Sequence, residues 1–110
     1  METEVRTVLV TAPDAQSAES MARTLVEERL AACVNVIPGL VSVYRWEGGV
    51  QRDEEALMIL KTTESRVAPL RERVVQLHPY EVPEVLVLNV VDGHETYLGW
   101  VRDAVGDTHG

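Results

Sequence analysis

The 110-residue sequence contains a single cysteine, Cys33, and few basic residues. One cysteine excludes an intrachain disulfide framework, so we expect a packed core and a cytoplasmic protein. Ten Lys and Arg residues stand against eighteen Asp and Glu residues, which gives a net charge of −8. This shortage of positive charge argues against nucleic acid as a partner, because phosphate binding needs a basic surface.

Long apolar runs are also missing. No stretch approaches the roughly 18 apolar residues of a membrane helix, so we expect no membrane partner. The acidic segment Met1–Glu4 is unlike a signal or transit peptide. There is no repeat and no low-complexity tract. With 45% hydrophobic residues the chain has enough for a core, and we expect one domain over residues 1–110 with a frayed tail over 106–110.

Runs of β-branched and apolar residues predict four strands. A hairpin turn is expected at Gly48–Gly49, and Pro38–Gly39 interrupts the second run before it resumes. The predicted strands cover residues 5–11, 33–46, 50–62 and 85–91.

Apolar residues at helical spacing predict three helices. The first follows Pro13–Asp14 and carries its apolar stripe from Ala18 to Val26. The second runs to Leu77 with Ser65 as its cap. The third ends near Val105, and Asp92-x-x-Glu95 before it reads as a capping box.

The resulting order β-α-β-β-α-β plus a helix predicts an α+β, ferredoxin-like fold with an antiparallel sheet. Two helices cover one face of such a sheet, so the other face is expected to be polar. The third strand contradicts this, because Leu57 and Ile59 point opposite to Met58 and Leu60. An exposed apolar face of that size requires a cover, and another subunit is the simplest one.

The segment His78-Pro79-Tyr80-Glu81-Val82-Pro83-Glu84 predicts a site. Its two prolines exclude a helix and fix an extended or turn conformation between the second helix and the last strand. A histidine, a tyrosine and carboxylates are therefore held on a short, stiff connector.

Five motifs run through nearly the whole chain, from about Val8 to Arg102. They are Leu30-Ala31-Ala32-Cys33-Val34-Asn35-x-Ile37-Pro38-Gly39, Tyr44-x-Trp46-Glu47-Gly48, Leu60-Lys61-Thr62-Thr63, His78-Pro79-Tyr80-x-x-Pro83-Glu84 and Tyr97-Leu98-x-Trp100. Their combination resembles the CutA family of divalent-cation-tolerance proteins. The resemblance implies a ferredoxin-like subunit in a compact homotrimer, similar in shape to PII nitrogen-signalling proteins, and a link to copper and other divalent metals.

The resemblance also implies a site. Val10 and Leu77 stand where some family members carry a cysteine and a histidine proposed as copper ligands, so His78 is the retained metal ligand. The implied interface pocket consists of Cys33, Trp46, Glu55, Lys61, Tyr80 and Glu84.

Each of these residues also has a structural interpretation. Glu55 and Lys61 share strand parity, so they are a charge pair in a pocket, a structural ion pair, or, for Lys61, a strand-end side chain that reaches water. Cys33 fits a small buried hydrophobe better than a soft ligand. His78 can satisfy the last carbonyls of a helix. Tyr80 and Trp46 can simply pack.

The sequence predicts a binding protein. One cysteine and three scattered histidines cannot build a tight copper or zinc site in one chain, so a trimer would bind copper(II) or another divalent cation weakly at its interfaces. The alternative is a PII-like signalling or scaffold trimer with a small ligand in the interface cleft. An enzyme using Cys33 and His78 is disfavoured, because no oxyanion-hole glycine motif or third orienting residue is evident.

Overall fold

The computed structural model describes residues 3–106. The sheet is antiparallel throughout, with strand order β2-β3-β1-β4. The predicted βαββαβ order with an added C-terminal helix is confirmed, and so is the α+β, ferredoxin-like class. The elements are β1 (Val5–Ala12), α1 (Ala15–Glu27), β2 (Cys33–Trp46), β3 (Gly49–Thr63), the 3-10 turn η1 (Glu64–Arg66), α2 (Val67–Leu77), β4 (Leu86–Asn89) and α3 (Glu95–Ala104).

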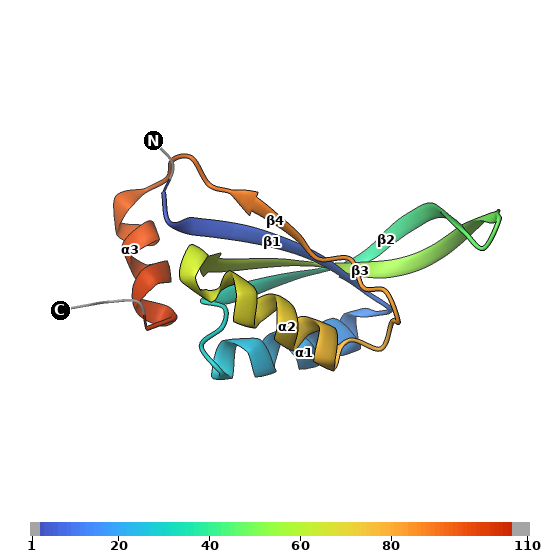
Figure 1. Cartoon of the computed structure of the whole chain (residues 1–110), viewed down its shortest axis with the longest axis horizontal. Coiled ribbons are helices and arrows are strands. Elements are labelled where there is room, and N and C mark those ends of the chain that lie inside the picture. The colour runs from blue at the N-terminus through green and yellow to red at the C-terminus, as the bar shows by residue number, and fades with distance from the viewer. Residues whose placement is uncertain (1–2, 107–110) are drawn as a thin grey trace.

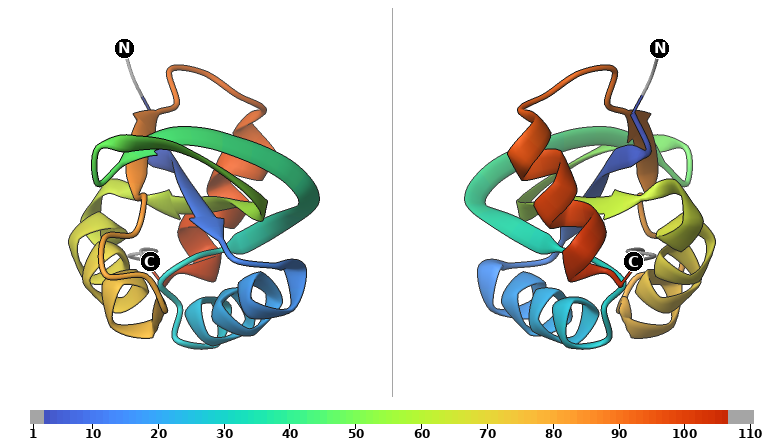
Figure 2. Two further views of the ribbon diagram at one scale, coloured as in Figure 1. Left: turned by 90° about the vertical axis from the view of Figure 1, so that its right-hand side faces the viewer. Right: turned by 90° about the vertical axis from the view of Figure 1, so that its left-hand side faces the viewer.

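The helices divide the molecule into two layers and an end cap. Helices α1 and α2 lie side by side under one face of the sheet, while α3 stands at one end of it (Figures 1 and 2). At the opposite end the β2–β3 hairpin projects well beyond both helices (Figure 1). The molecule is accordingly elongated, with principal extents of 51 × 28 × 22 Å.

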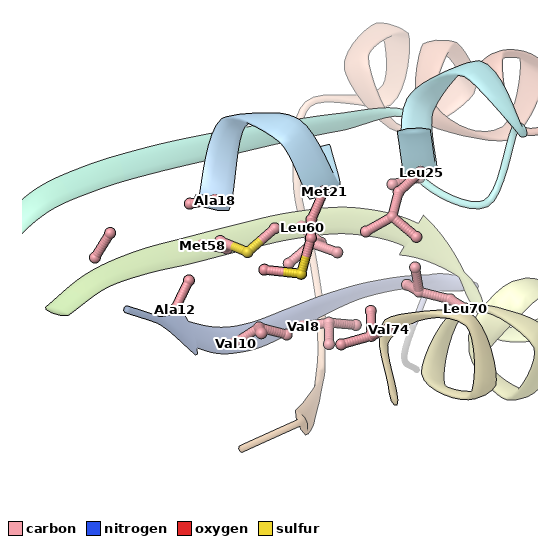
Figure 3. Close-up of a cluster of buried hydrophobic side chains, with 12 residues drawn as sticks. Val8, Val10, Ala12, Ala18, Met21, Leu25, Met58, Leu60, Leu70 and Val74 are labelled. Carbon is pink, nitrogen blue, oxygen red and sulfur yellow. The ribbon is translucent and has the colours of Figure 1, made fainter. Parts of the chain in front are cut away.

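The main core lies between the sheet and helices α1 and α2. In the β1–β3 register, Val8 pairs with Leu60 and Val10 with Met58, and all four side chains are buried (Figure 3). Leu25 of α1 closes this layer from the helical side. Alternate residues of each strand therefore fill the core, as the period of two requires.

The opposite side of the sheet, called the open face below, is apolar without being covered. Its central residues are Leu9, Ile37, Leu57, Ile59, Leu86 and Leu88. Ile37 is 45% exposed, Leu86 53% and Leu88 46%. The prediction that this sheet is apolar on both faces is therefore confirmed.

Helix α3 covers only one end of the open face. Its Leu98, Val101 and Val105 form a second, smaller core with Val5 and Ala32. Beyond that cluster, nothing within residues 3–106 lies over the middle of the face, because both other helices pack on the far side (Figure 2).

A β-bulge at Pro38–Gly39 changes which residues of β2 face the open side. Ile37 pairs with Leu57, but the next pair is Leu40 with Glu55, so two residues of β2 lie opposite Ala56. Gly39 supplies the positive φ of 78° that this kink uses. After the bulge, even-numbered residues of β2 therefore share a face with odd-numbered residues of β3.

The hairpin turn lies one residue earlier than predicted. Glu47 and Gly48 form the two-residue loop with φ values of 49° and 80°, while Gly49 already pairs with Trp46 in the ladder. Two consecutive positive φ values match the twist of the strands, and Gly48 meets that demand without steric cost.

The start of α1 follows the prediction. Asp14 is its N-cap, and the Asp14 carboxylate accepts a 2.7 Å hydrogen bond from the backbone N–H of Ser17. This bond is the main reason that the pKa of Asp14 lies below its ordinary value.

Two other predicted caps are wrong. Ser65 lies inside η1, and α2 begins after Arg66 without a side-chain cap, although Pro69 does fall in its first turn. His94 is the N-cap residue of α3, so the predicted capping box does not form. The Asp92 carboxylate instead accepts a hydrogen bond from its neighbour's backbone, which keeps that segment a loop.

The last strand is shorter than predicted, because β4 spans only Leu86–Asn89. Of the predicted frayed tail, residues 107–110 lie outside the described residues. Within 3–106 the helices are all too short or too polar to cross a bilayer.

Candidate functional site

A cavity of about 610 Å³ opens where the base of the β2–β3 hairpin meets the connector between α2 and β4. We call it the acidic cavity, because four carboxylates and no basic side chain line it. It lies on the open-face side of the sheet, since the bulge turns Tyr44 and Trp46 toward the side that Glu55 also faces. The lining residues are Thr11, Ser42, Val43, Tyr44, Trp46, Asp53, Glu55, Tyr80, Glu81, Val82 and Glu84.

Glu55 is the innermost charge of the cavity. The residue is only 9% exposed, and its Oε2 accepts a 2.6 Å hydrogen bond from the Tyr80 hydroxyl. No cationic side chain of residues 3–106 contacts it. A carboxylate taken out of water without a counter-charge is costly, so the cavity favours a positive group.

A second tyrosine–carboxylate pair lies further out on the same strand face. The Tyr44 hydroxyl donates to Asp53 Oδ2. Asp53 and Glu55 are two residues apart on β3 and therefore point the same way, roughly 7 Å apart along the strand.

Both tyrosines remain donors at neutral pH. Burial and the hydrogen bond to Glu55 raise the pKa of Tyr80 well above its ordinary value, and the bond to Asp53 raises the pKa of Tyr44. When folding raises the pKa of a tyrosine, the resulting stabilisation is fully present below about pH 10, which is the pKa in the unfolded chain. The stabilisation is lost as the pH rises through the pKa in the folded state. The carboxylates are therefore held in place throughout the physiological range.

The His78 side chain links β1 to the connector between α2 and β4. Its Nδ1 accepts from the backbone N–H of Tyr80 at 3.1 Å, and its Nε2 lies 2.7 Å from the carbonyl oxygen of Thr11. A carbonyl only accepts, so Nε2 carries the proton and donates. The ring is also tilted against that of Tyr80 with centroids 4.7 Å apart.

The geometry argues against the expectation that His78 binds a metal. Both ring nitrogens are engaged and the residue is 7% exposed. A metal would have to displace a buried backbone partner, which would then be left unsatisfied. His78 instead ties β1 to the connector and holds Tyr80 over Glu55.

The predicted pocket residues separate into two groups. Trp46, Glu55, Tyr80 and Glu84 line the acidic cavity together. Cys33 and Lys61 do not: they face each other across the β2–β3 ladder near the opposite end of the open face.

The predicted pairing of Glu55 with Lys61 is absent. The Lys61 ammonium donates to the side-chain oxygen of Asn35, while Glu55 is bonded to Tyr80. Equal parity does put both on one face, but six residues of strand separate them by roughly 20 Å. Of the alternatives, a strand-end lysine with a local polar partner describes Lys61.

Cys33 is half-buried and lies beside α3. Its Sγ is 3.6 Å from the Tyr97 hydroxyl, and burial of that hydroxyl, together with this contact, raises the pKa of Tyr97 to about 12. The thiol is therefore part of the packing between the sheet and α3, which fits the structural interpretation of Cys33.

Within residues 3–106, no three His, Cys, Asp or Glu side chains are close enough together to hold a metal ion. The four carboxylates of the acidic cavity are spread along its walls, and two of them already accept from tyrosines. The described part of the chain therefore offers oxygen donors for a weakly held cation and has no ready three-ligand shell.

The sequence interpretation missed Tyr44 and Asp53 as site residues. Neither residue belongs to the pocket that the resemblance implies, although Tyr44 lies in one of the family motifs. A signal was available in Pro38–Gly39: a Pro-Gly step inside a strand indicates a bulge, and a bulge exchanges the two faces beyond it.

Comparison with known proteins places the chain in one family. Residues 6–104 match the family model described as CutA1 divalent ion tolerance protein. The divalent-cation tolerance protein CutA of Thermus thermophilus is 50% identical over 99 residues, covering 90% of this chain and 96% of the relative. Human protein CutA is 48% identical over 89% of this chain, which spans 55% of the human protein.

Solved structures agree. The divalent cation tolerance protein of Thermus thermophilus superimposes with a TM-score of 0.90 at 49% identity, covering 93% of this chain and 99% of the other. CutA from Xylella fastidiosa gives a TM-score of 0.92 at 40% identity, covering 94% and 99%. With a family match over nearly the whole chain and a shared fold, the protein belongs to the CutA1 divalent-ion-tolerance family.

Proposed function

We propose that this chain is the subunit of a homotrimeric binding protein in divalent-cation tolerance, which holds a divalent cation weakly where subunits meet. The observation that carries the proposal is the position of the acidic cavity: it lies on the open face, which is apolar and uncovered in one chain. Assembly and binding would then use the same side of the sheet.

The trimer is supported by what the monomer exposes. Along the projecting hairpin Val43 is 67% exposed, Val50 68% and Trp46 46%, in addition to the open face itself. β2 is moreover a 14-residue edge strand, and an edge of that length invites pairing with another chain. Three subunits closing as a ring, as the family resemblance implies, would cover both surfaces.

Divalent cations are supported by the donors. Asp53, Glu55, Glu81 and Glu84 provide hard oxygen ligands, and a neighbouring subunit could complete a shell that one chain leaves open. Copper(II) heads the affinity order for oxygen and nitrogen sites, so it should bind more tightly than zinc. Without His78 or Cys33 in the shell, that binding should remain weak.

Titration with copper(II) should give a dissociation constant on the order of 10⁻⁴ M, in the range of weak carboxylate sites. Affinity should hardly change between about pH 7.5 and 6.0, because a metal held by imidazole is released as pH falls through about 6.5 and one held by carboxylates is not. Isothermal calorimetry in a buffer that does not bind metals measures both. Glu84→Gln should weaken binding, whereas Glu72→Gln, on the exposed side of α2, should not. Equal losses in the two variants would count against this site.

Trp46→Ala should loosen the trimer more than Trp100→Ala. Trp46 ends β2 on the projecting hairpin, whereas Trp100 lies against Tyr97 on α3, with ring centroids 5.6 Å apart. An aromatic anchor buried in an interface is commonly worth about 2 kcal/mol or more, so Trp46→Ala should weaken each contact between two subunits roughly thirtyfold. Light scattering over a dilution series compares the two variants; coincident curves would contradict the assignment of the hairpin to the interface.

The second candidate function is a PII-like trimer that binds a small organic ligand and signals its presence. A cavity of about 610 Å³ is the size of ordinary ligand sites, and its aromatic walls suit a molecule better than a bare ion. In both candidates the chain binds and does not catalyse. We further propose the cytoplasm as its compartment, given the free thiol of Cys33.

A further inference from the structure

The acidic cavity has aromatic walls that a divalent-cation site does not need. Its walls combine four carboxylates with the rings of Tyr44, Trp46 and Tyr80, and none of its lining residues is basic. Aromatic faces attract cations that have shed part of their water, and organic ammonium groups do so far more readily than metal ions.

Two of the carboxylates, the buried Glu55 and the exposed Asp53, each have a tyrosine hydroxyl as partner. Each accepts a tyrosine hydroxyl on one oxygen, Glu55 from Tyr80 and Asp53 from Tyr44. Their other oxygens contact no donor in the part of the chain that the structure describes. Glu55 as a whole is only 9% exposed, but its remaining oxygen keeps some exposure within the cavity that the residue lines, so it can accept a hydrogen bond from a ligand there.

The spacing of these acceptors suits a linear molecule. Asp53 and Glu55 lie two residues apart on one face of β3, which separates them by roughly 7 Å. Three-ligand metal geometry is absent among residues 3–106. Two separated anionic points in a cavity that also has aromatic walls fit two ammonium groups joined by an apolar spacer.

We propose that the acidic cavity binds a linear alkyl diamine or polyamine. One ammonium group contacts Glu55 at the inner end, the alkyl chain lies along the aromatic rings, and a second ammonium group reaches Asp53, with Glu81 and Glu84 of the connector adding charge at the mouth. This inference rests on the proposed function, because both place the ligand in the acidic cavity. It adds that the cavity prefers an organic cation.

Binding is tested with 1,4-diaminobutane and spermidine on the full-length assembled protein. The fluorescence of Trp46, read in a Trp100→Phe background, reports occupancy because Trp46 lines the cavity. Both amines should bind at least tenfold more tightly than copper(II), and 1,4-butanediol, which has the same length without charge, should not bind. n-Butylamine, with one ammonium group, should bind less tightly than the diamine.

Glu55→Gln should raise the dissociation constant of the diamine at least tenfold. The matched control is Glu54→Gln: it removes the same charge from the adjacent residue of β3, which is exposed and does not line the cavity. If Glu55→Gln does not fold, Glu84→Gln on the exposed connector serves instead, with an expected loss of about threefold.

Several outcomes overturn the proposal. Absence of amine binding at millimolar concentration would do so, including the case in which a side chain of a neighbouring subunit already fills the cavity. Equal binding of diamine and diol, or equal losses in Glu54→Gln and the cavity variants, would show that no specific cation site exists. Failure of amine binding alongside weak copper binding would overturn this inference and leave the proposed function intact; the reverse result would overturn the metal ligand and retain the amine site.

Discussion

Replacing Ile59 with aspartate is expected to reduce the protein from about three times its chain mass of 12.2 kDa to a single chain. Ile59 lies at the centre of the open face, paired with Leu9 on β1 and Asn35 on β2. An aspartate there would have to lose its water in every interface of the assembly without a counter-charge. Such burial costs several kcal/mol per site, and each 1.4 kcal/mol changes a dissociation constant about tenfold.

The effect is measured by light scattering coupled to gel filtration at micromolar protein concentration. Val75→Asp is the matched control, because Val75 is 51% exposed on α2, on the other side of the molecule. It makes the same chemical change and should leave the mass unaltered. A wild-type protein that is already monomeric would refute the trimer, and an Ile59→Asp protein of unchanged mass would show that the open face is not the interface.

Replacing His78 with alanine should destabilise the fold by about 3 kcal/mol while leaving metal affinity within about twofold of the wild type. The substitution leaves the Thr11 carbonyl and the Tyr80 N–H without their partners, and each buried unsatisfied group costs about 1–3 kcal/mol. It also removes a ring that packs on Tyr80. Denaturant unfolding at a fixed protein concentration measures the loss, because oligomer stability depends on concentration.

His94→Ala is the control for this experiment. His94 is exposed at the start of α3 and makes no capping hydrogen bond, so its loss should cost no more than about 0.5 kcal/mol. Loss of copper binding in a His78→Ala protein of unchanged stability would restore His78 as a metal ligand. It would also mean that the ring leaves its two backbone partners when the metal binds.

Most of the fold could be predicted from local pattern. The β-branched and apolar runs of β1 and β3 and the apolar stripe of α1 predicted those elements, and the order of all the elements predicted the ferredoxin-like topology. The errors were local too. Ser65 and Asp92 carry the usual capping chemistry, yet η1 and a loop take those positions, because a cap residue works only where the chain path allows the helix to begin.

The candidate site was predicted in part. The prolines and the family motifs indicated residues of the connector and the hairpin, and four of these, Trp46, Glu55, Tyr80 and Glu84, line one cavity. Parity put Glu55 and Lys61 on one face, but parity carries no information about distance along that face. The bulge at Pro38–Gly39 had to be recognised before Tyr44 could be placed beside Asp53.

The sequence by itself determined the elements, their order, the apolar character of both sheet faces and the family to which the chain belongs. The elements and the apolar faces follow from side-chain patterns that repeat about every 2 or 3.6 residues, and backbone geometry sets these periods locally. The family follows from short contiguous motifs. The tertiary structure alone decided the hydrogen-bond partners: the Tyr80 hydroxyl rather than Lys61 for Glu55, and the Thr11 carbonyl and Tyr80 N–H for the ring of His78. Such pairings join segments up to 67 residues apart. They depend on how the whole chain packs, because a polar group that becomes buried during folding hydrogen-bonds to the partner that the fold brings within about 3 Å.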